Sequence, residues 1–165
     1  MKYILLICFA VFFSCNENKK EEPVAPEKAE IAIAAIPLLN LNGAPIDWTA
    51  YKGKTVFINF WATWCGPCLE EMPSIQAAMD KLKNENIVFL FASDETTDQI
   101  NKFKAGHDFN FNYLRIDDMG VLNIVGLPTT MIFDASGQKV FSEMGYRNWN
   151  SKENIELLTG IINTK

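Results

Sequence analysis

The fold of this 165-residue chain is decided by the stretch Asn59-Phe60-Trp61-Ala62-Thr63-Trp64-Cys65-Gly66-Pro67-Cys68. It overlaps the end of an apolar run, residues 55–61, that is typical of a strand buried on both faces of a sheet. Pro67 suits the first turn of a helix, where its missing N–H would have had no partner. The two cysteines are therefore expected where a strand gives way to a helix, one helical turn apart. This placement is typical of a dithiol redox site.

The expected chemistry follows from the position of the two cysteines. A cysteine at a helix N-terminus lies where unpaired N–H groups and the positive end of the helix dipole stabilise a thiolate. Cys65 is therefore the predicted nucleophile, and Cys68 is predicted to resolve the mixed disulfide that Cys65 forms with a partner. A purely structural disulfide would gain little here, because so short a loop hardly constrains the unfolded chain.

A zinc site could use the same cysteine spacing, but it needs two further ligands. The other cysteines, Cys8 and Cys15, lie in the N-terminal leader, and the only histidine is His107. His107 follows Gly106 in a polar turn, where a solvated side chain is expected rather than a catalytic base. No metal and no other cofactor is therefore expected. The net charge of −5 and the lack of a basic patch argue against nucleic acid as a partner.

The rest of the chain alternates apolar strands with amphipathic helices. Further strands are predicted over residues 87–92, 113–116, 131–133 and 139–144. One helix is predicted to follow Cys68, kinked at Pro73, and another to follow the cap residues 96–98. The apolar positions of the first helix and of a closing helix are Leu69, Met72, Ile75, Met79, Leu82, Ile155, Leu158 and Ile162. This order predicts a single α/β domain, a mixed central β-sheet flanked by helices.

Residues 56–68 resemble the active-site segment of the thioredoxin family. The stretches 59–63 and Glu71-Met72-Pro73 resemble its membrane-anchored, extracytoplasmic branch, the TlpA/ResA-like thiol–disulfide oxidoreductases. The resemblance covers residues 34–165 and implies a thioredoxin fold with an extra N-terminal β-hairpin, for which residues 36–43 are the candidate. It also implies that the substrates are proteins that carry disulfides.

The resemblance further implies which residues meet a substrate. Pro128, in Gly126-Leu127-Pro128-Thr129, matches the cis-proline that faces the active site across the thioredoxin fold. A cis bond there would present the backbone of Leu127 to an extended partner peptide. The predicted substrate-binding residues are Trp64, Gly66, Pro67, Leu127, Pro128 and Thr129.

Two positions bear on proton transfer. Cytoplasmic thioredoxins carry a buried Asp where this chain has Asn59, which cannot accept a proton. Glu71 matches a glutamate that lies near the dithiol in the ResA-like branch, and it is the predicted third catalytic residue, holding the proton of Cys68. The alternative for Glu71 is a solvated helix glutamate, as Glu70 is expected to be.

The N-terminus resembles that of a bacterial lipoprotein. Residues 1–14 read as a signal peptide, with a positive charge at Lys2 and an apolar run at 3–13 that is too short to span a membrane. The sequence Phe12-Phe13-Ser14-Cys15 resembles a lipobox, although Phe12 stands where an aliphatic residue is usual, so Cys15 is the predicted lipidation site. Residues 15–33 read as a flexible linker, rich in charge and proline. The alternative is an ordinary cleaved signal peptide.

Together these features predict a lipid-anchored, monomeric enzyme of the cell envelope that reduces disulfides of partner proteins. It would face the periplasm or the cell surface and draw electrons from a donor in the membrane. The branch allows apocytochrome c as a substrate, in cytochrome c maturation. One alternative is a thiol peroxidase, whose usual Thr or Ser and Pro are replaced by Ala62 and Ile58. The other is a non-catalytic binding lipoprotein.

Overall fold

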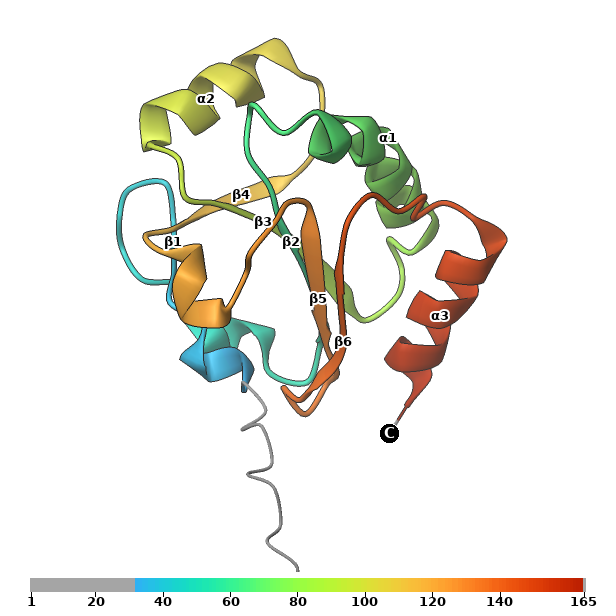
Figure 1. Ribbon diagram of the computed structural model, residues 1–165. Helices are drawn as coiled ribbons and strands as arrows, with labels where there is room; N and C mark the ends of the chain where they lie inside the picture. The colour runs from blue at the N-terminus through green and yellow to red at the C-terminus, as the bar shows by residue number, and fades with distance from the viewer. Residues whose placement is uncertain (1–31, 165) are drawn as a thin grey trace, which may run out of the picture.

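The apolar run before the cysteines forms the central strand β2 (Thr55–Phe60), in which every residue is buried. In this computed structural model, which describes residues 32–164, β2 lies in the middle of a six-stranded sheet (Figure 1). The strand order is β1-β4-β3-β2-β5-β6. β2 pairs in parallel with β3 (Ile87–Ser93) and antiparallel with β5 (Thr129–Phe133), so the sheet is mixed, as the sequence predicted.

The remaining elements follow the predicted order. The other strands are β1 (Leu38–Leu39), β4 (Asn112–Ile116) and β6 (Lys139–Met144). The α-helices are α1 (Gly66–Lys81), α2 (Thr97–Gly106) and α3 (Lys152–Asn163). Short 3₁₀ helices are η1 (Ile33–Ala35), η2 (Trp48–Tyr51) and η3 (Met119–Leu122). The predicted strands are thus confirmed to within two residues, and Pro73 lies inside α1 as expected.

Successive residues of β2 point to opposite faces of the sheet and enter two separate cores. Phe57 belongs to the core that contains residues of all three α-helices. Val56, Ile58 and Phe60 belong to the other core, against which β1, η2 and η3 pack. Asn59 shares the face of Phe57, so its side chain points toward the α-helices. This alternation sets the position of the site described below.

The expected N-terminal hairpin has one regular strand in the structure. β1 pairs antiparallel with β4 at the edge of the sheet. After it, the N–H of Asn40 donates to the carbonyl of Ala44 at 2.8 Å, and the N–H of Ile46 donates to the carbonyl of Leu38 at 3.0 Å. The second arm is not a regular strand of the described chain. A complete two-stranded hairpin therefore stays a prediction.

The described chain begins at the end of the sheet where β2 starts. The N–H of Ile33 donates to the carbonyl of Gly137, in the turn between β5 and β6, at 3.1 Å. Gly137 has a φ of +84°, and a Cβ there would lie 2.9 Å from a methyl carbon of Ile33, so the contact requires glycine. Ile33, the last residue of the predicted linker, thus already packs on the domain.

The predicted signal peptide and Cys15 lie outside the described residues. Between residues 32 and 164, no helix combines the length and apolar character needed to cross a membrane.

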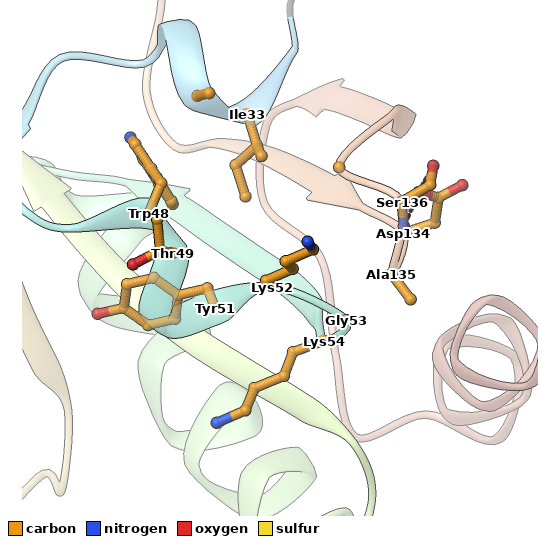
Figure 2. A pocket seen from close by; sticks show the side chains of 12 residues that line it. Ile33, Trp48, Thr49, Tyr51, Lys52, Gly53, Lys54, Asp134, Ala135 and Ser136 are labelled. Atoms are coloured by element: carbon orange, nitrogen blue, oxygen red, sulfur yellow. Dashed lines mark hydrogen bonds between the residues drawn. The ribbon is translucent and has the colours of Figure 1, made fainter.

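A hollow of about 230 Å³ lies at this same end, between η1, η2 and the β5–β6 turn (Figure 2). Its walls include Ile33, Trp48 and Tyr51. None of the predicted site residues lines it, because the length of β2 separates it from the cysteines: Lys54 precedes this strand, and Cys65 follows it.

Candidate active site

The two cysteines form a disulfide at the start of α1. Cys65 is the residue that caps the helix, and its sulfur accepts a hydrogen bond from the backbone N–H of Cys68 at 3.2 Å. Such an N–H stabilises a thiolate at the same position. Cys65 is 4% exposed and Cys68 is completely buried. Cys65 is thus the more exposed of the two cysteines, as the sequence predicted for the attacking one.

The residues next to Cys65 face solvent. Trp64 is 73% exposed, and Gly66 and Pro67 are exposed as well. Three of the predicted substrate-binding residues are thus open to a partner protein at the head of α1.

The Leu127–Pro128 peptide bond is cis, as the resemblance implied. Pairing of β5 with β2 sets Thr129 beside Phe60, so Pro128 lies at the same end of the sheet as the dithiol. The carbonyl of Pro128 accepts a hydrogen bond from the N–H of Gly145 at 2.7 Å, and both Pro128 and Thr129 are buried. The backbone N–H and carbonyl of Leu127 have no hydrogen-bond partner among residues 32–164. Both groups of Leu127 are therefore free to pair with a substrate.

Exposed apolar side chains flank this loop. Val125 is 88% exposed and Met144 is 59% exposed. Met144 pairs with Thr129 across β5 and β6, and its sulfur lies 2.6 Å from where a Cβ at position 126 would stand, so Met144 covers Gly126. Together with Trp64, these side chains give the dithiol end of the molecule an apolar surface, which is typical of a protein-binding site.

Glu71 lies one turn after Cys68 on α1 and is completely buried, whereas Glu70 is exposed. One carboxylate oxygen of Glu71 accepts a hydrogen bond from the side-chain amide of Asn59 at 2.7 Å. The other accepts one from the backbone N–H of Arg147 at 3.2 Å. A solvated helix glutamate therefore describes Glu70 and not Glu71.

Burial raises the pKa of Glu71 from an ordinary 4.5 to about 7. The hydrogen bonds from Asn59 and Arg147 oppose this effect, because they favour the charged carboxylate. The indole of Trp149 also faces the carboxylate, but its N–H stands outside hydrogen-bond geometry. Glu71 can therefore take up and release a proton near neutral pH, as a proton relay must.

A second buried carboxylate, Glu95, holds the loop that precedes Cys65, and the sequence did not reveal it. Its two oxygens accept hydrogen bonds from the backbone N–H and the hydroxyl of Thr63, each at 2.6 Å. The hydroxyl of Ser93 donates to it at 3.2 Å. The available sequence signal was an acidic residue at the carboxyl end of β3, which lies beside the end of β2.

The segment that carries Arg147 is braced against α1, a link that residue spacing did not predict. The hydroxyl of Ser74 accepts a hydrogen bond from the N–H of Trp149 at 3.0 Å and donates one to the carbonyl of Glu71 at 2.7 Å. The guanidinium of Arg147 donates to the buried side chain of Asn154 at 2.6 Å. The pair Ser74 and Trp149 is separated by 75 residues, so no local pattern indicates it.

His107 lies at the exposed end of α2, away from any catalytic group. Its ring stacks on that of Phe103, with centroids 3.9 Å apart, and its Nδ1 lies 2.8 Å from the carbonyl oxygen of the same residue. Over residues 32–164 no three His, Cys, Asp or Glu side chains gather as a metal site requires.

Comparison with known proteins bears on this geometry. The sequence model of the AhpC/TSA family matches residues 30–150. The chain belongs to this family. It is 33% identical over 162 residues to the thiol-disulfide oxidoreductase ResA of Bacillus thuringiensis subsp. konkukian, covering 93% of this chain and 88% of that protein. To ResA of Bacillus subtilis it is 31% identical over 147 residues, covering 83% and 78%.

The fold also matches solved structures. A thiol:disulfide interchange protein from a Bacteroides species superposes with a TM-score of 0.64, covering 78% of this chain and 86% of the other at 21% identity. The thioredoxin-like fold expected from residues 56–68 is thus confirmed. Because its ResA relatives are thiol–disulfide oxidoreductases and the chain has the Cys65–Cys68 pair, it is a thiol–disulfide oxidoreductase, an enzyme whose substrates carry disulfides.

Proposed function

We propose that this protein is tethered to a membrane of the cell envelope and reduces disulfides of partner proteins there. The observation that carries the proposal is the Cys65–Cys68 disulfide at the N-terminus of α1, with Glu71 buried one turn behind it. The Gly-Pro pair between the cysteines resembles that of reducing thioredoxins, whose reduction potential is about −270 mV, rather than that of strong oxidants, whose reduction potential is about −120 mV.

Reduction proceeds in two exchanges. The Cys65 thiolate attacks one sulfur of the partner's disulfide, that S–S bond breaks, and the second partner sulfur leaves and takes up a proton. Cys68 then gives its proton to Glu71 and attacks the sulfur of Cys65. The bond between Cys65 and the partner breaks as the Cys65–Cys68 disulfide forms, and the departing partner sulfur takes up the proton held by Glu71. The partner thus leaves with two thiols and two additional electrons. An electron donor in the membrane returns two electrons and two protons to the pair.

A partner is proposed to bind as an extended segment beside the cis-proline loop. The support is the backbone of Leu127, which has both of its hydrogen-bonding groups free in the described chain. Main-chain pairing of this kind holds a peptide regardless of its sequence. The residues assigned to this contact are Trp64, Gly66, Pro67, Leu127, Pro128 and Thr129.

The tether rests on the N-terminal sequence. Cys15 would carry the lipid, and the charged, proline-containing linker would let the domain reach its partners as a monomer that faces the periplasm or the cell surface. An apocytochrome c cysteine pair, reduced during cytochrome c maturation, is one substrate that this location allows. Other envelope proteins with disulfides are equally compatible.

The test is insulin reduction by the mature protein with dithiothreitol as the electron source. We expect the protein to accelerate insulin precipitation well above dithiothreitol alone, and Cys65→Ser to abolish the acceleration. A rate equal to that of dithiothreitol alone would refute the reductase proposal. It would favour the binding lipoprotein instead.

The thiol peroxidase alternative lacks its supporting residues. Ala62 and Ile58, which stand where a peroxidatic site needs a hydroxyl and a proline, are both buried apolar residues. Peroxide consumption by the reduced protein tests this alternative, and we expect none beyond slow oxidation of the free dithiol.

A further inference from the structure

The side-chain amide of Asn59 makes hydrogen bonds through its nitrogen but none through its oxygen. Its nitrogen donates to the Glu71 carboxylate at 2.7 Å and to the hydroxyl oxygen of Thr130 at 3.1 Å. Both of its hydrogens are thus used, yet its oxygen has no partner among the described residues, and Asn59 is completely buried. A buried carbonyl oxygen without a partner is costly, so the contact made by the nitrogen has to offset that cost.

Of the two hydrogen-bond donors to Glu71, one is a backbone group and the other is a side chain. Arg147 contributes a backbone N–H, which any residue except proline would supply. Asn59 contributes a side-chain N–H, and it is the one side chain of the described chain that donates to this carboxylate. Hydrogen bonds to a carboxylate are stronger than those between neutral groups, and they favour its charged form. The identity of residue 59 therefore matters to the charge of Glu71 in a way that the identity of residue 147 does not.

We propose that Asn59 is a positioning residue that keeps the buried Glu71 able to ionise, and thereby able to accept the proton of Cys68. The inference rests on the proposed function, in which Glu71 relays that proton. Asn59 cannot accept the proton itself, but in this role it helps Glu71 to accept it. The amide acts through Glu71 by holding one of its oxygens with a donated hydrogen bond. Without the amide, that oxygen would lose the one side-chain hydrogen bond that it accepts in the described chain.

The other charged groups near Glu71 are already paired elsewhere. The guanidinium of Arg147 pairs with Glu143 of β6 and with Glu153 of α3, so its charge is not directed at Glu71 alone. From α1 the facing titratable group is Cys68, which does not titrate while the disulfide is intact. The oxidised protein therefore isolates the effect of the Asn59 amide on the charge of Glu71.

The test is a titration of the Glu71 carboxyl carbon by ¹³C NMR in the mature, disulfide-bonded protein, with Glu71→Gln used to identify the signal. Replacing Asn59 by leucine keeps a similar volume and keeps the site dry, but removes the donor. We expect Asn59→Leu to move the midpoint of Glu71 upward by about one pH unit or more. At pH 7 the ionised fraction would then fall about fivefold.

Thr130→Val is the matched control, because it removes the other partner of the same amide and leaves the bond to Glu71 in place. We expect its midpoint to equal that of the wild type. Asn59→Asp keeps the shape of the side chain, and it is the variant to titrate if Asn59→Leu does not fold. We expect it to raise the Glu71 midpoint as well, because it supplies a second negative charge instead of a donor.

Two outcomes would overturn the inference: a wild-type midpoint in Asn59→Leu, or an equal displacement in Thr130→Val, which would mean that any disturbance of the buried cluster has the same effect. The titration needs no catalysis, whereas the insulin assay measures catalysis directly. Failure of the inference and failure of the proposed reductase function are therefore distinguishable.

Discussion

The side chain of Asn59 and the carboxylate of Glu71 form a buried hydrogen bond of 2.7 Å that joins strand β2 to helix α1. These two elements also carry the dithiol, since β2 leads into Cys65 and α1 contains Cys68. The bond therefore links the one buried carboxylate of α1 to the scaffold that positions both sulfurs. In this bond β2 supplies a neutral donor and the neighbouring helix supplies the carboxylate.

The first prediction concerns proton transfer at the dithiol. An ionised Glu71 near Cys68 disfavours a second negative charge, so Glu71→Gln should lower the apparent pKa of the thiols by about one pH unit. The measurement is the rate of Cys65 alkylation by iodoacetamide across pH in the reduced protein. Glu70→Gln is the matched control, because it removes the same charge from the exposed neighbouring position. Superimposable curves for wild type and Glu71→Gln would mean that the carboxylate is not coupled to the dithiol.

The second prediction concerns stability. Because the pKa of Glu71 is raised in the folded state, from 4.5 to about 7, folding takes up a proton between these values, and stability falls as pH rises through them. Glu71→Gln removes this dependence. Relative to wild type, the variant should gain up to about 3 kcal/mol of unfolding free energy between pH 4.5 and pH 8. Urea unfolding of both oxidised proteins at the two pH values measures the gain, and a constant difference would contradict it.

Local signals predicted much of this molecule from its sequence. The run at 55–61, apolar apart from Asn59, predicted β2, and Pro67 predicted the start of α1 beside Cys65. These features each depend on residues within a few positions of one another, and composition and periodicity report such relationships well.

The rest of the site depends on contacts between distant residues. Thr130 receives the Asn59 amide across 71 residues, and Trp149 reaches Ser74 across 75. Glu95 binds Thr63 across 32 residues from the end of the neighbouring parallel strand. Strand pairing decides the contacts of Thr130 and Glu95, and the packing of the segment before α3 on α1 decides that of Trp149. Neither kind of relationship is readable from any single segment.

The third prediction concerns the loop before Cys65. Glu95→Ala would leave the partly buried N–H and hydroxyl of Thr63 without their acceptor, so it should cost about 2 kcal/mol of unfolding free energy and slow insulin reduction. Thr63→Val removes only the hydroxyl and leaves the backbone bond, so it should cost less. Urea unfolding measures both. Equal stability of Glu95→Ala and wild type would show that this carboxylate does not hold the loop.

The fourth prediction concerns the membrane anchor. If Cys15 carries a lipid, the protein should collect in the membrane fraction and incorporate labelled palmitate. Cys15→Ala should abolish the labelling, while Cys8→Ala should not. A soluble and unlabelled wild-type protein would contradict the anchor and leave the redox assignment untouched.

The central claim is that Cys65 attacks a partner's disulfide and Cys68 releases the partner. Its most direct test is trapping, because Cys68→Ser keeps the attacking thiol and removes the one that resolves the mixed disulfide. Cells that produce Cys68→Ser should yield envelope extracts in which high-mass adducts of this protein appear on non-reducing gels and vanish with reductant. Cys65→Ser should yield few or none. Equal trapping by the two variants, or more by Cys65→Ser, would contradict the assignment.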